Sequence, residues 1–338
     1  MKRVKVKFVD FYTSTYREYI LDAISQVVDC EECDEPDFLF YGAGGKEYLK
    51  YDCVRTFWVT EELEPDFNLC DYAVSYTDIH FYDRVVYLPV WASPFLCNTM
   101  QNVLKKNNCE DDFFENRPRF CNFIYSNGKG DPFRANVFHA LNAYKHVDSA
   151  GRYLNNMGSD QIAGDRFSAN WEENKKAFLR QYRFTIAMSN AQKFGHLDEK
   201  IFDAWAAGTV PIYWGDPLIS KTFNPQSFID CTDCSTAQQV VERVRRYEED
   251  PVAFAEMQHE PIVKDEQKLL DYIRERQEET KRFLQHIVLQ DPEHARRRSN
   301  GSRMVMHEEA AQILAAAEKN VFYKAYRRLW RIRHGSRL

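Results

Sequence analysis

Two basic side chains occur near predicted helix starts, where a cation is normally disfavoured. Arg134 comes just after Pro132, which opens an apolar-periodic helix, and Lys200 stands early in a second helix. The N-terminal end of a helix carries partial positive charge and unpaired N–H groups, so it attracts anions. We therefore expect a diphosphate held by two helix starts, a guanidinium and an ammonium. The alternative for each cation, taken alone, is a surface side chain paired with a local carboxylate.

The sequence contains no motif that would bind phosphates through a metal. It has no P-loop, no GxGxxG and no Asp-x-Asp pair, and the run Gly42-Ala43-Gly44-Gly45 predicts a tight turn. An enzyme that binds a nucleotide diphosphate through a carboxylate-held divalent ion would usually show an Asp-x-Asp pair. We therefore expect no metal and no other cofactor, with cations and backbone donors neutralising a diphosphate.

The nine cysteines form an odd set, which indicates reduced thiols more than a disulfide framework. Two Cys-x-x-Cys pairs occur, Cys30 with Cys33 and Cys231 with Cys234. A four-cysteine zinc site built from both pairs is one interpretation, and ordinary buried thiols are the other.

Strand and helix patterns alternate along the chain. Strands are predicted at residues 4–9, 38–41, 54–59, 72–75, 85–90, 119–125, 184–188 and 210–214. Helices are predicted at residues 16–28, 132–144, 171–181, 198–207, 236–249 and 266–289. This alternation of strands and helices is typical of doubly wound parallel α/β sheets. Residues 97–118 lose the periodicity and predict a connector. Residues 292–303, which include Arg296, Arg297 and Arg298, indicate a basic linker.

The last twenty residues differ in charge from the rest of the chain. From Lys319 to Leu338 there are seven basic residues and no acidic ones. Because the whole chain has a formal net charge of −6, the first 318 residues carry a net charge of −13. Apolar side chains interleave with these cations, which predicts an amphipathic helix of the kind that lies on an anionic membrane. A helix docked on the acidic body is the alternative. Nucleic acid is not an expected partner, because the body would repel phosphates.

No stretch approaches the roughly 18 consecutive apolar residues of a membrane-spanning helix. The N-terminus alternates apolar Val4, Val6 and Phe8 with lysines, as a strand does and a signal peptide does not. We expect a soluble cytoplasmic protein.

Several stretches resemble glycosyltransferase family 10, the α-1,3/1,4-fucosyltransferases, and its bacterial members in particular. The matching stretches are DCVRTFWVTEELEPDFNLCDYAVSY (52–76), RFCNFIYSN (119–127), FRANVFHALNAYKHVDSAGRYLNNMG (133–158), KKAFLRQYRFTIAMSN (175–190) and GHLDEKIFDAWAAGTVPIYWGDPLISKTFNPQSFID (195–230).

This resemblance implies a GT-B-like α/β fold, in which two Rossmann-like domains face each other across a cleft. The expected domains are an acceptor-binding domain over residues 1–115, a GDP-sugar-binding domain over residues 116–291, and a basic linker and helical tail over residues 292–338. The resemblance also implies metal-independent transfer of fucose from GDP-fucose, with inversion at the anomeric carbon.

Carried over residue by residue, Arg134 matches the arginine that neutralises the diphosphate, and Lys200 the lysine beside it. Glu199 matches the carboxylate that contacts the fucose ring. The other residues expected to bind the donor are Ser126, Asn127, Asn190 and His196.

Glu61 matches the candidate general base, the carboxylate that takes the proton of the acceptor hydroxyl. Its neighbours Glu62 and Glu64 are rival bases, and a solvated turn before Pro65 is the non-catalytic alternative.

This sequence departs from the family pattern on the donor side. Ser189-Asn190-Ala191 replaces the usual Glu-Asn-Ser, His196 replaces a tyrosine and Asp198 replaces a threonine. The identity of the donor sugar is therefore the most open part of the interpretation.

Together these features predict an inverting α-1,3-fucosyltransferase that acts on an N-acetyllactosamine-type surface glycan. Lipopolysaccharide, capsule or Lewis-antigen synthesis and protein glycosylation are its expected settings, at the cytoplasmic face of a bacterial membrane. The alternatives are a related transferase with another GDP-sugar or acceptor, and a catalytically idle glycan-binding relative.

Overall fold

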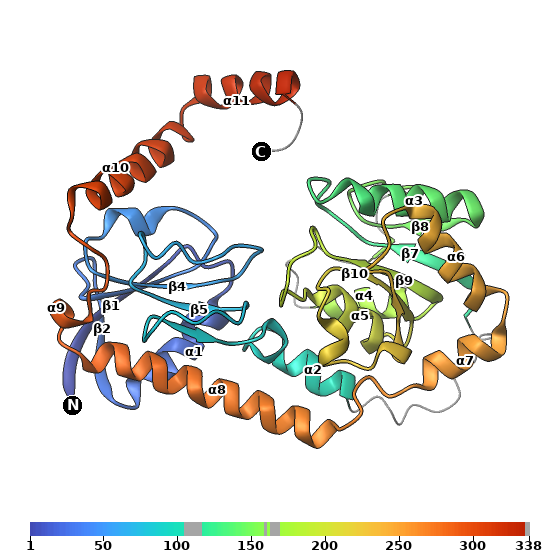
Figure 1. The fold of residues 1–338 in the computed structure, drawn as a ribbon, viewed down its shortest axis with the longest axis horizontal. Helices are drawn as coiled ribbons and strands as arrows, with labels where there is room; N and C mark the ends of the chain where they lie inside the picture. The colour runs from blue at the N-terminus through green and yellow to red at the C-terminus, as the bar shows by residue number, and fades with distance from the viewer. Residues whose placement is uncertain (105–116, 159–160, 163–169, 335–338) are drawn as a thin grey trace. The chain divides into compact units, whose positions relative to one another are not determined.

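The computed structural model describes residues 1–104, 117–158, 161–162 and 170–334 (Figure 1). The chain forms two compact units, the first made of residues 1–88 and 278–338 and the second of residues 89–277. The first unit thus includes residues 278–291, which were expected in the second domain, and residues 292–338, which were expected to form a separate linker and tail.

The first unit contains a six-stranded parallel sheet in the order β2-β1-β3-β4-β5-β6. Its strands are β1 (Lys2–Val9), β2 (Val28–Glu32), β3 (Phe38–Tyr41), β4 (Val54–Trp58), β5 (Tyr72–Ser75) and β6 (Val85–Tyr87). Strands β3, β4 and β5 are buried along their whole length. Burial on both faces explains why they appear as continuous apolar runs rather than alternating patterns.

The second unit contains a five-stranded parallel sheet in the order β11-β10-β9-β7-β8. Its strands are β7 (Arg119–Phe123), β8 (Val147–Ser149), β9 (Tyr182–Met188), β10 (Val210–Trp214) and β11 (Ile229–Asp230). Helices α3 (Pro132–Tyr144) and α6 (Ala237–Glu248) pack together over the main hydrophobic cluster. Helices α4 (Trp171–Leu179) and α5 (Glu199–Ala206) contact each other and strand β9.

Each sheet has a topological switch point. There, the strand that follows in sequence is added on one side of a given strand, and a later strand is added on its other side. In the first sheet this point lies between β1 and β3, and in the second between β7 and β9. Open α/β sheets bind ligands outside the carboxyl ends of the strands at such points. The fold therefore offers one candidate binding place in each unit.

Some elements differ from the sequence-based prediction. Part of the expected connector, residues 97–104, forms helix α2 (Cys97–Leu104), and its remaining residues 105–116 lie outside the described part. Helix α1 (Ser14–Ser25) ends three residues earlier than predicted, because the chain turns into the unpredicted strand β2. Helix α7 (Pro251–His259) was also not predicted, whereas α10 (Ser302–Ala317) lies within the expected linker and helical tail.

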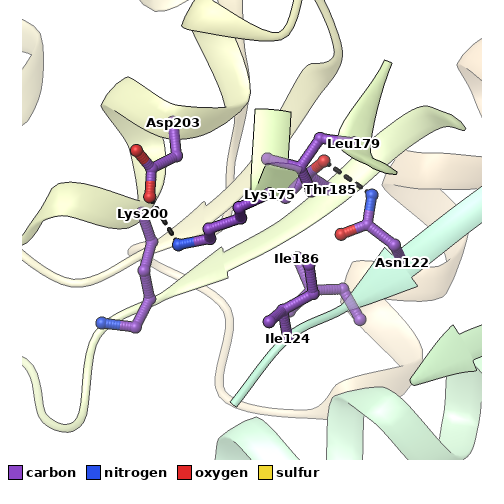
Figure 2. Close-up of a pocket in the computed structure, with 8 residues that line it drawn as sticks. All are labelled: Asn122, Ile124, Lys175, Leu179, Thr185, Ile186, Lys200 and Asp203. Carbon is purple, nitrogen blue, oxygen red and sulfur yellow. Dashed lines mark hydrogen bonds and ion pairs between the residues drawn. The ribbon is translucent and has the colours of Figure 1, made fainter. Parts of the chain in front are cut away.

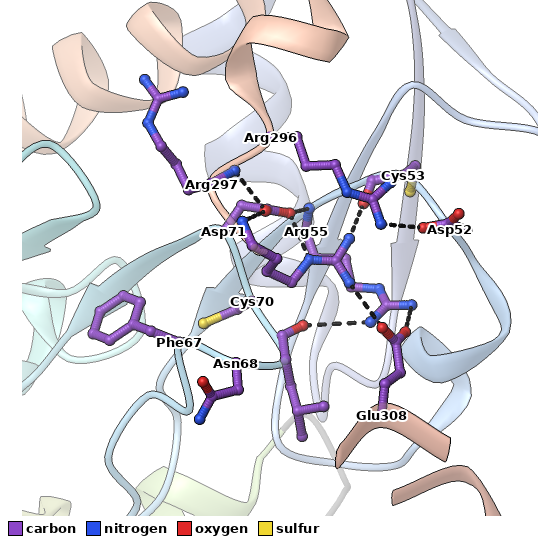
Figure 3. Close-up of polar contacts among 12 residues, drawn as sticks. Asp52, Cys53, Arg55, Phe67, Asn68, Cys70, Asp71, Arg296, Arg297 and Glu308 are labelled. Carbon is purple, nitrogen blue, oxygen red and sulfur yellow. Dashed lines mark hydrogen bonds and ion pairs between the residues drawn. The ribbon is translucent and has the colours of Figure 1, made fainter. Parts of the chain in front are cut away.

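Three successive arginines anchor the expected basic linker to the first unit, and Figure 3 shows Arg296 paired with Asp52. Each of them meets a different carboxylate: Arg296 with Asp52 at 2.6 Å, Arg297 with Asp83 at 2.5 Å and Arg298 with Asp71 at 3.0 Å. These three carboxylates lie just before strands β4, β5 and β6, so the basic segment is ion-paired with the first unit.

Glu308 of α10 extends this cluster. Its carboxylate meets the buried Arg55 of β4 at 2.5 Å and Arg298 at 3.5 Å. Arg55 and Arg298 are almost completely buried, so loss of Glu308 would leave buried cations with less compensation. Helix α10 is therefore an integral part of the first unit.

The basic, apolar-interleaved segment forms helix α11 (Val321–His334), as predicted. Val321, Phe322, Tyr326 and Leu329 are exposed on it. Within the described ranges, no helix is both long and apolar enough to cross a bilayer.

Candidate active site

Arg134 lies in the first turn of α3, at the switch point of the second sheet. The helix starts there because Asp131 caps it by accepting from the Phe133 N–H (2.8 Å), and Pro132 has no N–H to lose. The Arg134 side chain is only 1% exposed. Its guanidinium donates to Oδ1 of Asn190 (2.7 Å) and to the carbonyl of Asn127.

One donor of this guanidinium remains unused. Within the described part of the chain, Nε of Arg134 is buried and has no hydrogen-bond partner. A buried N–H without an acceptor costs free energy that a bound anion would recover. Nε of Arg134 is therefore a buried donor whose acceptor the described residues do not supply.

Gly130 allows the guanidinium to take this position. A Cβ on residue 130 would lie 2.8–2.9 Å from the Arg134 guanidinium, closer than real Cβ contacts. The loop between β7 and α3 therefore needs a residue without a side chain at this point.

Tyr125 connects the two predicted cations. Its ring centroid lies 4.3 Å from the guanidinium carbon of Arg134 and 5.7 Å from Nζ of Lys200. The Tyr125 hydroxyl accepts from the N–H of Met188 (2.8 Å) and lies 2.9 Å from the Met188 carbonyl oxygen, which fixes the ring against β9. The sequence-based analysis missed Tyr125, although it stands at the carboxyl end of β7 beside the predicted loop.

Lys200 stands in the first turn of α5 and is held by two carboxylates. Its ammonium lies 2.7 Å from Asp198 and 3.4 Å from Glu199. Burial alone lowers the pKa of Lys200, but these carboxylates outweigh burial and raise its pKa above the usual range. Asp198 is also the N-cap of α5, accepting from the Lys200 N–H.

Glu199 is 41% exposed at its side chain, so it is accessible to a ligand. Burial raises its pKa, but the charges of Lys200 and Lys175 outweigh burial, and its pKa lies well below the usual range. A carboxylate kept ionised here can accept hydrogen bonds from sugar hydroxyls.

Lys175 of α4 and Asp203 of α5 form an ion pair of 2.6 Å that the sequence-based analysis did not identify (Figure 2). They line a small cavity together with Lys200, and its volume of about 10 Å³ fits one water molecule, not a sugar nucleotide. Asp203 stands four residues after Glu199, so helical spacing places the two on one face. The Lys175–Asp203 ion pair therefore lies close enough to Glu199 and Lys200 to interact with them electrostatically.

His196 is buried in the loop before α5, and burial lowers its pKa below the usual value. The loop turns at Gly195, whose φ of +75° suits glycine, and the Gly195 N–H donates to Asp216 (2.9 Å). Ser126 and Asn127 are exposed in the loop after β7. The loops that carry Asn127, Asn190 and His196 thus surround the switch point.

Glu61 belongs to the first unit, three residues after β4, and is exposed. Within the second unit, the structure joins Arg134 to Asn127 and Asn190. It also joins Lys200 to Glu199, and both cations lie near the ring of Tyr125.

Among the described residues, no three or more His, Cys, Asp or Glu side chains are grouped so as to hold a metal ion. The two Cys-x-x-Cys pairs belong to different units.

Two sequence profiles of fucosyltransferase domains match the chain. The profile of the "Alpha-(1,3)-fucosyltransferase FucT N-terminal domain" matches residues 6–93. The profile "Glycosyltransferase family 10 (fucosyltransferase) C-term" matches residues 114–259. The chain belongs to glycosyltransferase family 10, the fucosyltransferases.

Two curated relatives are also named fucosyltransferases. Alpha-(1,3)-fucosyltransferase FucT of Helicobacter pylori is 28% identical over 247 residues, which are 64% of this chain and 48% of the relative. Alpha-(1,4)-fucosyltransferase of Arabidopsis thaliana is 30% identical over 117 residues, which are 32% of this chain and 29% of the relative. The chain thus spans about half or less of the length of these relatives.

Solved structures of an α1,3-fucosyltransferase have the same fold. One superimposes with a TM-score of 0.61 at 22% identity, covering 82% of this chain and 90% of the other. A second structure, solved with GDP-fucose, superimposes with a TM-score of 0.58 at 21% identity. The match covers 82% of this chain and 91% of the other. The likeness confirms the predicted GT-B-like α/β fold.

Proposed function

We propose that this protein is an inverting α-1,3-fucosyltransferase that transfers fucose from GDP-fucose to an N-acetyllactosamine-type glycan. Membership of glycosyltransferase family 10 supports the class of reaction. A relative named Alpha-(1,3)-fucosyltransferase and a related structure solved with GDP-fucose support the linkage and the donor.

The observation that carries the proposal is the Arg134 guanidinium. It is buried at the switch point, stacked over Tyr125 and left with a free Nε donor. A guanidinium held in this way binds phosphate oxygens through fixed donors. Lys200, near the same ring, adds a second cation for the charge that develops on the leaving diphosphate.

The proposed reaction is a direct displacement. The acceptor oxygen bonds to the anomeric carbon of fucose while the bond from that carbon to the β-phosphate breaks, and GDP leaves with the electron pair. Glu61 takes the proton of the acceptor hydroxyl, and Glu199 accepts hydrogen bonds from the fucose ring. Attack from the face opposite the leaving group converts the β-linked donor into an α-linked product.

A second candidate is a related transferase that uses another GDP-sugar. Asp198 favours it, because this carboxylate stands at a donor-side position where the family resemblance implies threonine, and it is bound to Lys200. An idle glycan-binding relative is a third candidate, and the retained Arg134, Glu199 and Lys200 argue against it.

Titration calorimetry with GDP, GDP-fucose and GDP-mannose separates the first two candidates. We expect GDP and GDP-fucose to bind, and GDP-fucose to be consumed only when an acceptor is added. Preferential binding and transfer from GDP-mannose would overturn the choice of donor, and binding without turnover across a glycan acceptor screen would favour the idle relative. Linkage analysis of the product decides between 1,3 and 1,4 transfer.

We further propose that the reaction needs no metal and that the protein works at the cytoplasmic face of a membrane. The absence of an Asp-x-Asp pair supports the first point. The exposed apolar and basic side chains of α11 support the second. Loss of transfer in the presence of a chelator, restored by a divalent ion, would contradict metal independence.

A further inference from the structure

The first sheet has its own switch point, between β1 and β3. In the second sheet, the corresponding place carries Arg134 and Asn190, the proposed donor site. In the first sheet, the loop after β1 spans residues 10–13 and the loop after β3 spans residues 42–46. The topology makes these loops the expected ligand site of that unit.

The two loops are packed backbone against backbone. Asp10 has a φ of +60°, which costs free energy for a residue with a side chain, although Asp tolerates it better than most. Its carbonyl accepts from the Gly44 N–H at 2.7 Å, and a Cβ on Gly42 or Gly44 would lie 2.7 Å from that oxygen. Strain of this kind persists at places where structure is maintained for function.

This arrangement presents the ring of Tyr12 to solvent. Tyr12 is 62% exposed, yet its hydroxyl is held by a hydrogen bond to the carbonyl of Ala43 (3.3 Å). A large aromatic side chain that is both exposed and fixed by its polar tip offers a rigid apolar face to a ligand.

Tyr12 also lies beside the proposed base. The Ala43 N–H donates to Oγ1 of Thr60 (3.3 Å), which ties the loop after β3 to the loop that carries Glu61. Burial and then the charge of Glu61 raise the pKa of Tyr12, as expected for neighbouring groups. The ring and the carboxylate therefore belong to one surface of the first unit.

The charges of this surface exclude a phosphate ligand. In the loops of residues 10–13, 42–46 and 59–61, all described by the structure, the single cation is Lys46, and it pairs with Glu318 of α10 (2.8 Å). An uncharged ligand with an apolar face for the ring and hydroxyls for the carboxylate fits this surface. A pyranose ring has both.

We propose that the ring of Tyr12 is the platform on which the acceptor sugar stacks, with a hydroxyl of that sugar directed to Glu61. This inference rests on the proposed function, because it names where that reaction's acceptor binds. It assigns Tyr12 to acceptor recognition and leaves donor recognition to Arg134 and Lys200.

The test compares Tyr12→Ala and Tyr12→Leu, which remove the ring, with Tyr12→Phe, which keeps it. Tyr82→Ala is the matched control, because Tyr82 is 94% exposed in the same unit and lies three residues before the start of β6, away from the carboxyl ends of the strands. We expect the acceptor KM to rise about tenfold without the ring, the size of a lost aromatic contact. Tyr12→Phe and Tyr82→Ala should match the wild type.

Two further readouts keep the result decisive. GDP affinity by calorimetry should be unchanged in every Tyr12 variant, since donor binding belongs to the other unit. Saturation-transfer NMR with N-acetyllactosamine, in the presence of GDP, should show sugar contact that is lost in Tyr12→Leu and kept in Tyr12→Phe. An unchanged acceptor KM in Tyr12→Leu, or equal KM values for Tyr12→Leu and Tyr12→Phe, would overturn the inference.

Failure of the proposed function has a different signature. If the wild type binds N-acetyllactosamine through Tyr12 but consumes no GDP-fucose, the sugar site stands and the transferase assignment falls. If the wild type transfers fucose and Tyr12→Leu does so with an unchanged acceptor KM, the transferase assignment stands and the role of Tyr12 falls.

Discussion

Nζ of Lys200 lies 2.7 Å from Oδ2 of Asp198, so the ammonium expected to neutralise a diphosphate is already paired with a carboxylate. Asp198 stands where the family resemblance implies a neutral threonine. A diphosphate that approaches Lys200 therefore also meets the negative charge of Asp198, which weakens its binding.

Asp198→Asn should consequently tighten GDP binding. Asparagine keeps the N-cap of α5 and removes the charge, so the gain should be about fivefold, or roughly 1 kcal/mol for a partly buried pair. Calorimetric titration with GDP measures it. Asp198→Thr, which also preserves the cap, should act in the same direction, and weaker GDP binding in both variants would show that Asp198 contributes favourably to the site.

Gly130→Ala should weaken GDP binding about tenfold with little loss of stability. The new Cβ would press on the guanidinium of Arg134, and this flexible end can move away only by leaving Asn190 and the proposed phosphate position. Gly128→Ala is the control in the same loop, because its Cβ would meet the Tyr153 ring instead. Equal GDP affinities for Gly130→Ala and wild type would argue against a role of the Arg134 position in binding.

Glu61→Gln should retain GDP-fucose binding and lose transfer by about 100-fold or more, the usual contribution of a general base. The measurements are donor affinity by calorimetry and kcat with a saturating acceptor. Glu62→Gln and Glu64→Gln are the matched controls and should stay near wild-type turnover. Wild-type kcat in Glu61→Gln would remove this residue from the mechanism.

The buried His196 should make the protein less stable as pH falls. Because burial lowers its pKa in the folded state, the unfolded chain binds more protons below about pH 6.5, and stability is lost on further acidification by at most about 1.4 kcal/mol per pH unit. Asp198 and Glu199 oppose this effect, while Lys193 and Lys200 reinforce it.

Urea unfolding between pH 7.5 and 5 measures that slope. His196→Gln should reduce it, whereas His139→Gln, on the exposed side of α3, should leave it unchanged. An identical pH dependence in His196→Gln and wild type would contradict the prediction.

Removal of residues 321–338 should release the protein from anionic liposomes and preserve transfer to a soluble acceptor. This cut removes α11, whose described contacts with the preceding residues include the Arg327–Glu318 pair. Liposome co-sedimentation measures the first effect, and unchanged sedimentation would refute a membrane role for α11.

A cut after Arg303 is the informative contrast. It removes Glu308 and leaves the buried Arg55 and Arg298 with less compensation, so stability should fall by about 3 kcal/mol or more. A fully stable protein after this cut would show that the arginine cluster does not need α10.

The sequence by itself determined the local elements and the types of residue at the donor site. Periodicity located α3 from Pro132 to Tyr144 and α8 from Glu266 to Leu289, because the amphipathic pattern of a helix is written in consecutive residues. Arg134 and Lys200 were identified because a cation at a helix start conflicts with the helix dipole.

The tertiary structure alone decided which residues meet. Three examples join segments far apart in the chain: Tyr125 near both cations, Lys175 against Asp203, and Arg298 against Asp71. These contacts depend on strand order and on where each loop leaves its sheet. Side-chain spacing along the sequence carries no record of strand order, because parallel neighbours in a sheet are separated by whole crossover connections.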